Sequence, residues 1–172
     1  DFILTNILKE KELPIYFVPQ CLSATVEDRN FSELLEFTTR QMKITAVYSR
    51  NHWLLAFFGS ALFVIVLLAA IPVLLFSSIY SVGFWFAIFT LVTVSWFSIM
   101  KSKLRMQAVE MVLPDYQAQI VKQDKKQNYL WFLSPPVYLY NSFAALFSKT
   151  ILWRGIEYSL DSPNRTTILQ KK

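Results

Sequence analysis

The longest unbroken pattern in the chain is an apolar tract between Arg50 and Lys101 that contains no Asp, Glu, Lys or Arg. One crossing of a bilayer needs about 20 apolar residues, at a helical rise of about 1.5 Å each. The tract is therefore long enough for two crossings, and we predict spans at about 54–76 and 84–100. Residues 77–83, rich in serine, are expected to form the turn between them.

The segment before the tract alternates apolar and polar positions with two different periods. Residues 1–11 place their apolar side chains on one stripe, which predicts a short helix. The runs at 15–18 and 20–26, separated by a proline, predict two short strands. Asn30, with Glu33 three residues later, has the pattern of a capping box. We expect it to begin an amphipathic helix that lies at the membrane surface and leads into the first span.

Four further elements are predicted after the tract. One of them, at residues 115–128, is polar and should form a short helix. Residues 101–112 are amphipathic and should form a helix. Residues 129–147 are apolar but carry a proline pair near the centre, which predicts an interfacial or re-entrant segment kinked at the prolines. Residues 150–169 contain two strand-like runs around Arg154 and Gly155, which predict a β-hairpin.

The predicted fold class is a mainly α-helical membrane protein. It has a two-helix transmembrane hairpin, amphipathic interfacial helices, a small α/β part at the N-terminus and a short C-terminal β-hairpin. Along the chain this gives four segments, residues 1–50, 51–100, 101–149 and 150–172.

Charge placement predicts the topology of the two spans. Lys43 and Arg50 precede the apolar tract, and Lys101, Lys103 and Arg105 follow it at once, whereas the turn between the spans is uncharged. Positively charged flanks stay preferentially on the cytoplasmic side of a membrane. We therefore expect both flanks, and the basic C-terminal segment, to be cytoplasmic.

Composition excludes several classes of site. The chain has a net charge of +5, one cysteine (Cys21), one histidine (His52) and three glycines. This rules out an intramolecular disulfide, a multi-cysteine zinc site, a histidine-rich metal cluster and a glycine-rich phosphate loop. Inside the two spans the polar side chains are Ser and Thr, which argues against a transporter or a proton relay.

Three stretches before the apolar tract and one after it carry a family resemblance. They are Asp1-Phe2-Ile3-Leu4-Thr5, Phe17-Val18-Pro19 with Glu27-Asp28, Glu36-Phe37-Thr38-Thr39-Arg40-Gln41-Met42, and Leu152-Trp153-Arg154-Gly155-Ile156-Glu157-Tyr158. In this order they resemble the end of a membrane-bound family 2-type glycosyltransferase, most closely the ceramide glucosyltransferase-like branch. The resemblance covers essentially the whole chain. It implies that residues 1–50 end a GT-A-type catalytic domain whose nucleotide-binding half lies upstream of Asp1.

The resemblance implies an inverting sugar transfer from a nucleotide sugar to a lipid hydroxyl, ceramide- or glycerolipid-like, at the cytoplasmic membrane face. An acceptor hydroxyl is a poor nucleophile, so a carboxylate must take its proton. Asp1 is the candidate catalytic base. The leaving nucleoside diphosphate needs a divalent metal, Mg or Mn, and basic side chains. The metal ligands are expected upstream, none in this chain, and the chain by itself is expected to be inactive. No nucleic-acid partner is expected.

The third stretch matches the family's Gln/Arg-x-x-Arg-Trp element. It makes Arg40, Gln41 and Lys43 the candidates for the leaving-group or acceptor side, although Lys43 replaces the family's second Arg and Ile44 replaces its Trp. The last stretch resembles the family's Trp-Arg-Gly-x-x-Tyr ending. It makes Trp153 and Arg154, the residues before Gly155, candidates for support of the active site.

Simpler interpretations of the same residues stay open. Asp1 also fits an ordinary acid at a helix N-terminus. Arg40 and Lys43 also fit the headgroup-facing side of an interfacial helix. Trp153 and Arg154 also fit a structural cation–π pair. For the whole chain, the alternatives are a processive polysaccharide synthase and a non-catalytic membrane-anchoring protein. The missing Trp at Ile44 and the small number of spans argue against the synthase.

Overall fold

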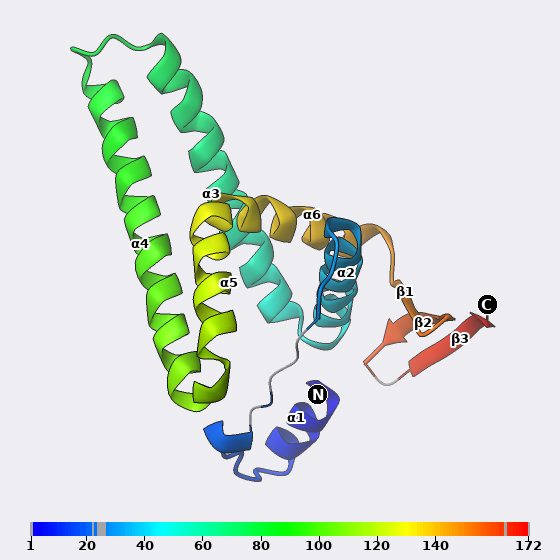
Figure 1. The fold of residues 1–172 in the computed structure, drawn as a ribbon. Coiled ribbons are helices and arrows are strands. Elements are labelled where there is room, and N and C mark those ends of the chain that lie inside the picture. The colour runs from blue at the N-terminus through cyan, green and yellow to red at the C-terminus, as the bar shows by residue number, and fades with distance from the viewer. Residues whose placement is uncertain (1, 22, 24–26, 164, 172) are drawn as a thin grey trace. The chain divides into compact units, whose positions relative to one another are not determined.

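Helices make up most of the structure, and an antiparallel sheet of three strands forms its C-terminal end (Figure 1). The computed structural model describes residues 2–21, 23, 27–163 and 165–171. The chain divides into two compact units. Unit 1 contains Asp1–Phe17, Glu27–Ala61 and Pro136–Lys172, and unit 2 contains Val18–Val26 and Leu62–Pro135.

Unit 1 begins with the helices α1 (Phe2–Glu10) and α2 (Phe31–Tyr48). The backbone N–H of Glu33 donates to Asn30 Oδ1 at 2.9 Å, and the N–H of Asn30 donates to Glu33 Oε2 at 3.0 Å. These reciprocal bonds satisfy donors that the first turn of a helix cannot pair internally. The predicted capping box, and the helix that it begins, are confirmed.

The sheet of unit 1 consists of β1 (Thr150–Trp153), β2 (Ile156–Ser162) and β3 (Arg165–Lys171) in sequential antiparallel order. Between β1 and β2, Arg154 and Gly155 have φ values of 51° and 76°. Two positive φ values belong to the tight turns whose twist matches that of a hairpin. The predicted hairpin turn is therefore confirmed, and a third strand, which we did not predict, extends the sheet.

Two long helices, α3 (Arg50–Phe76) and α4 (Val82–Val112), account for the apolar tract. Both are long and apolar enough to cross a membrane, and 11% and 6% of their most apolar windows are buried. Such low burial distinguishes them from the core helices of a soluble protein, whose apolar side chains are covered. α4 continues through the segment 101–112, which we had predicted as a separate helix.

Unit 2 continues after α4 with η2 (Pro114–Tyr116), α5 (Gln117–Leu130) and η3 (Trp131–Leu133). The next helix, α6 (Ser134–Phe147), leads back into unit 1. The proline pair lies in the first turn of α6, where a missing N–H costs no helical hydrogen bond. The break in the segment 129–147 therefore lies at η3, directly before the prolines and not at them. That the segment is interfacial or re-entrant stays a prediction.

Among the described residues of the N-terminal segment, the predicted α/β part is not seen. Residues 15–18 form no strand, and Pro19–Cys21 is a turn of 3-10 helix, η1. The remaining residues predicted as strand, 22 and 24–26, lie outside the described residues. The side chains of Tyr16 and Phe17 are 82% and 76% exposed. A strand needs a neighbour to bond its N–H and C=O groups, and an apolar run alone does not supply one.

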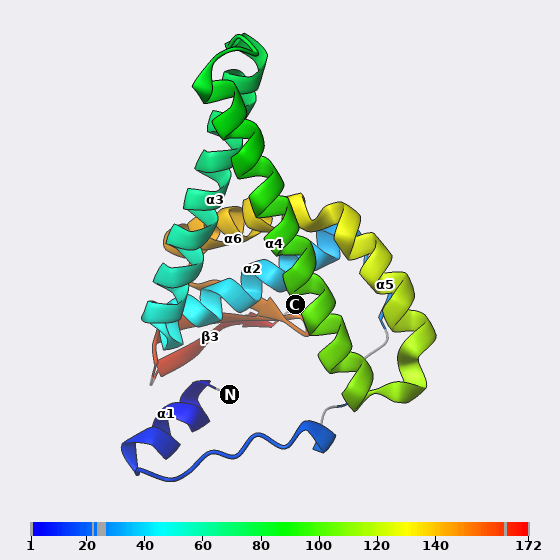
Figure 2. The same ribbon diagram turned by 90° about the vertical axis from the view of Figure 1, so that its left-hand side faces the viewer.

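The core of unit 1 lies where α2, the start of α3 and α6 meet. Met42, Trp53 and Ala145 are buried together, and Phe57 stacks on Trp53 with ring centroids 5.5 Å apart. Phe143 meets Phe57 edge to face at 5.2 Å. Figure 2 shows α2 between α6 and the sheet, and α2 contacts both β1 and β2. This placement gives one face of α2 access to the strands.

Candidate functional site

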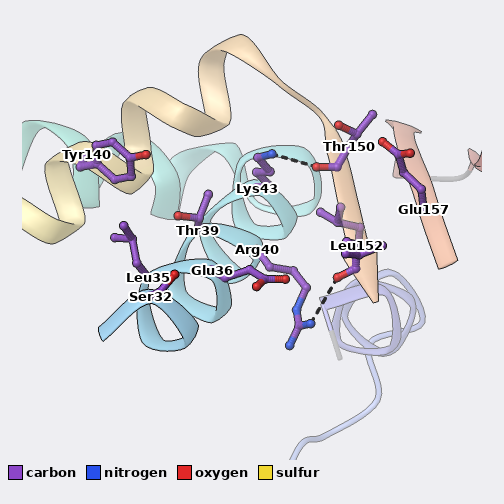
Figure 3. Close-up of a pocket in the computed structure, with 11 residues that line it drawn as sticks. Ser32, Leu35, Glu36, Thr39, Arg40, Lys43, Tyr140, Thr150, Leu152 and Glu157 are labelled. Carbon is purple, nitrogen blue, oxygen red and sulfur yellow. Dashed lines mark hydrogen bonds between the residues drawn. The ribbon is translucent and has the colours of Figure 1, made fainter. Parts of the chain in front are cut away.

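One face of α2 forms the wall of a pocket of about 400 Å³, which we call the polar pocket (Figure 3). The α2 residues that line it follow the spacing of a helical face, so a single rigid element positions all of them. β1, β2 and one residue of α6 form the rest. The lining residues are Ser32, Leu35, Glu36, Thr39, Arg40, Lys43, Tyr140, Thr150, Ile151, Leu152 and Glu157.

Lys43 joins α2 to the segment that leads from α6 into the sheet. Its Nζ donates to the backbone O of Thr150 at 2.8 Å and to Ser148 Oγ at 3.1 Å. Burial lowers the pKa of the Lys43 amine, because desolvation disfavours the charged form. Both of these acceptors are neutral, so they hold the amine in place without cancelling its charge.

Arg40 reaches β1 from the same face of α2. Its Nη1 donates to the backbone O of Leu152 at 3.4 Å, and its Cζ lies 5.4 Å from the centroid of the Phe37 ring. Two carboxylates, Glu36 and Glu157, also line the pocket. The polar pocket thus contains two cationic groups, which can stabilise a developing negative charge, and two potential proton acceptors.

The position of α2 is set by a buried polar contact with α6. Asn141 is 1% exposed, and its Oδ1 accepts a hydrogen bond of 2.7 Å from Thr39 Oγ1. Thr39 itself lines the polar pocket, one residue before Arg40. A buried hydrogen bond of this kind has one favourable register, so it fixes α2 against α6.

A second pocket, of about 270 Å³, adjoins the first, because Ile151 lines both. We call it the aromatic pocket, since Phe2, Tyr48, Trp153 and Tyr158 contribute rings to its lining. The other lining residues are Ile44, Ile151, Leu160 and Thr166. The aromatic pocket suits a hydrocarbon or another apolar group, while the polar pocket beside it suits a charged or hydroxyl-bearing group.

The structure brings together part of the predicted leaving-group side. Arg40 and Lys43 both line the polar pocket. Gln41 is exposed and does not line it, because one residue along a helix turns the side chain by about 100°. Asp1, the predicted base, lies outside the described residues.

The two residues predicted to support the site lie at the end of the hairpin. Trp153 lines the aromatic pocket and is 49% exposed. Arg154 occupies the turn, with its Cζ 5.5 Å from the centroid of the Trp153 ring. The cation–π pair is therefore present, and a role for Arg154 in the pocket remains a prediction.

Sequence reasoning missed the acidic and aromatic residues that complete the two pockets. Glu36 could have been found, since it precedes Arg40 by four residues and so shares its face of the helix. Glu157 and Tyr140 carried no such signal. Both reach the polar pocket through tertiary contacts of the sheet and of α6 with α2.

The polar pocket provides no dense metal site. In the part of the chain that the structure describes, no three His, Cys, Asp or Glu residues lie close enough to hold a metal ion together. The Mg or Mn that the resemblance implies stays an expectation, because its ligands are placed outside this sequence.

No family model, curated protein or solved structure matches the chain. The resemblance to lipid glycosyltransferases therefore depends on the four sequence stretches given above. The geometry of unit 1 is the other source of information about function.

Proposed function

We propose that this chain is the acceptor-binding and membrane-anchoring part of an inverting glycosyltransferase that moves a sugar from a nucleotide sugar to the hydroxyl of a membrane lipid. The observation that carries the proposal is the pair of adjoining pockets on α2, one polar with two cations and one aromatic. An amphiphilic acceptor needs both environments side by side. The helix that bears them leads directly into the first apolar helix.

The polar pocket suits the charged end of the reaction. When the acceptor oxygen attacks the anomeric carbon, the bond to the nucleoside diphosphate breaks and negative charge grows on the leaving group. Arg40 and Lys43 lie on one helical face where they can stabilise that charge. Asp1 remains the proposed base, and Glu157 is one of the two described carboxylates of the pocket, with Glu36, that could replace it in this role.

The aromatic pocket suits the lipid end of the acceptor. Its ring-lined wall would hold the hydrocarbon next to the hydroxyl, while Ile151 marks the boundary between the two environments. Ile44, where the family has Trp, lines this pocket, and Trp153 from β1 supplies an indole there instead. An indole ring from β1 thus lines the pocket where the family would place one from the helix.

A membrane location follows from the two apolar helices. Side chains such as Leu55, Phe58 and Ile65 on α3 and Phe89 on α4 are more than half exposed. In water they would form an apolar surface far larger than soluble monomers tolerate. We propose that α3 and α4 span the membrane and that the basic flanks, with the catalytic side, are cytoplasmic.

The test is sugar transfer by the native full-length protein in liposomes, with labelled nucleotide sugar and a ceramide- or diacylglycerol-type acceptor. Asp1→Asn should lower the rate by about 10²–10⁴-fold, the usual cost of losing a general base, and leave donor binding nearly unchanged. Glu157→Gln is the matched control and should retain transfer. Transfer by the Asp1 variant near the parental rate, with loss in the control, would move the base to Glu157.

The same assay tests the leaving-group side. Arg40→Ala should reduce transfer more than it reduces membrane association, and Lys43→Ala should reduce transfer less. Unchanged turnover with weaker membrane binding in the Arg40 variant would instead support a helix face that merely contacts headgroups. Absence of transfer to any lipid hydroxyl by the intact protein would favour the anchoring protein.

A further inference from the structure

A third pocket, of about 340 Å³, lies in unit 1 at the start of α3 and has no residue in common with the polar or aromatic pocket. Its charged and polar lining comes from Arg50, Trp53, Lys149, Asp161 and Ser162. The rest is apolar and comes from α2, α6 and the residue after β2. We call it the basal pocket. The proposed sugar transfer makes no use of it.

The basal pocket lies beside the start of the uncharged apolar tract. Arg50 is the last charged residue before the apolar tract. Within the next two turns of α3, Leu55 and Phe58 are 74% and 64% exposed. If α3 spans the membrane, this is the depth of the phosphate groups, with hydrocarbon beginning directly beyond it.

The charges of the basal pocket favour an anion. Arg50 and Lys149 both line it and are exposed, and neither is within ion-pair distance of a carboxylate among the described residues. Asp161 is the opposing charge, and its Oδ2 lies 3.9 Å from Nε of Arg165, a third cation that does not line the pocket. The Asp161 carboxylate also accepts hydrogen bonds from the hydroxyls of Ser159 at 2.6 Å and Thr167 at 3.1 Å, and these bonds, the one from Ser159 first, lower its pKa. Cations therefore outnumber the carboxylate at this pocket.

Trp53 forms part of the inner wall of the basal pocket. Its side chain is almost fully buried, at 6% exposure, and it packs with Met42, Ala145 and Phe57 in the core of unit 1. Its Nε1 atom has no acceptor among the described residues, and almost none of the surface of that atom is open to the pocket. Trp53 therefore shapes the basal pocket, and the case for an anion depends on Arg50 and Lys149.

We propose that the basal pocket binds the headgroup of an anionic glycerophospholipid. The phosphodiester lies between Arg50 and Lys149, and the acyl chains follow the exposed apolar side chains of α3. Basic groups beside membrane spans attract anionic lipids, and guanidinium groups bind phosphate oxygens with charge-assisted hydrogen bonds. The excess of cations at the pocket favours a headgroup with net negative charge, whereas a phosphatidylcholine headgroup has none.

The experiment uses the native full-length protein in nanodiscs that contain equal parts of phosphatidylglycerol and phosphatidylcholine. Lipids retained after extraction into mild detergent are counted by native mass spectrometry. We expect enrichment of phosphatidylglycerol, and the double variant Arg50→Gln with Lys149→Gln should lose at least tenfold of it. The matched control, Lys101→Gln with Lys103→Gln, removes the same charge beside the same apolar tract and should change retention less than twofold.

Three results would overturn the proposal. They are equal retention of the two lipids, equal loss in the Lys101 and Lys103 control, and displacement of the lipid by millimolar inorganic phosphate alone. The last would define a free-phosphate site. The proposal depends on the membrane location proposed above but not on sugar transfer. Resistance to alkaline extraction is measured on the same samples, so failure of insertion and failure of lipid binding are told apart.

Discussion

Unit 1 and the apolar helices of unit 2 differ in where their side-chain hydrogen bonds go. In unit 1, Thr39 bonds Asn141, Lys43 bonds Ser148 and Thr150, and Tyr48 OH lies 3.2 Å from Thr166 Oγ1. All of these contacts join residues more than 100 positions apart. In unit 2, the hydroxyls of Thr90 and Ser95 bond carbonyls only four residues earlier.

The difference agrees with the proposed function, in which the apolar helices anchor the protein and unit 1 carries the chemistry. Serine and threonine that bond back to their own helix keep their polarity internal, which a helix in hydrocarbon requires. Polar contacts between distant residues instead fix the relative positions of elements and leave charged groups at their junction. The polar, aromatic and basal pockets all lie in unit 1. The groove between α3 and α4 is lined by apolar residues and Thr90.

The largest expected effect comes from placing a charge in the apolar part. Ile65, near the middle of α3, is 63% exposed, and Ile65→Arg should disfavour insertion by about 3–4 kcal/mol. Leu152→Arg, at a 44% exposed position of β1, should leave insertion unchanged. Alkaline extraction of membranes measures both variants. If the Ile65 variant stays folded and soluble, α3 is not a span.

A smaller effect is expected at the buried contact between α2 and α6. Thr39→Val removes the donor and leaves Asn141 Oδ1 buried without it, which should lower the free energy of unfolding of unit 1 by about 1–3 kcal/mol. Thr90→Val, which removes a hydroxyl that bonds its own helix, is the control and should cost less than half as much. Thermal unfolding in detergent compares the two variants. Equal losses would mean that the contact does not fix α2.

Variants of Lys43 and Arg40 should affect the stability of unit 1 and the rate of transfer in opposite order. Lys43→Met loses two hydrogen bonds from a partly buried amine and should cost about 1–2 kcal/mol of stability, while Arg40→Met loses one long bond and should cost under about 1 kcal/mol. For the rate of transfer we expect the opposite order. Unfolding and transfer are measured on the same preparations. The same order in both measurements would mean that Arg40 acts only through stability.

The smallest effect is expected at the hairpin turn. Arg154 has a φ of 51°, a conformation that costs a residue with a Cβ roughly 1–2 kcal/mol. Arg154→Gly should therefore raise the stability of unit 1 by about 0.5–1 kcal/mol, after the loss of chain entropy for glycine. Arg154→Ala, which keeps the strain, is the control and should not stabilise. A loss of stability in the glycine variant would mean that the cation–π contact with Trp153 stabilises the protein by more than the strained turn destabilises it.

The same contrast explains which predictions from the sequence held. The apolar helices, the capping box at Asn30 and the turn at Gly155 depend on local composition and spacing, and they could be predicted. The run at 15–18 has strand-forming residues but no pairing partner in the described structure, so its propensity misled. β3 carries the β-branched run Thr166-Thr167-Ile168, a signal that we passed over.

The candidate site could be predicted only in part. The face of α2 that bears Arg40 and Lys43 follows from helical spacing, once the helix is known. The opposite wall, with Leu152 and Glu157, depends on how the sheet packs on α2, and no local pattern encodes that packing. The predicted Asp1 lies outside the described residues, so its role is a matter for the transfer assay.

The most direct test of the account asks where a lipid alcohol binds. A ceramide analogue with a photoreactive diazirine in its hydrocarbon chain is crosslinked to the native protein in liposomes, and the labelled peptides are mapped by mass spectrometry. The account predicts labelling around Ile151, Trp153 and Tyr158, which line the aromatic pocket, and its loss in excess unlabelled ceramide. Labelling confined to α3 and α4, or labelling that ceramide does not displace, would contradict an acceptor site in unit 1.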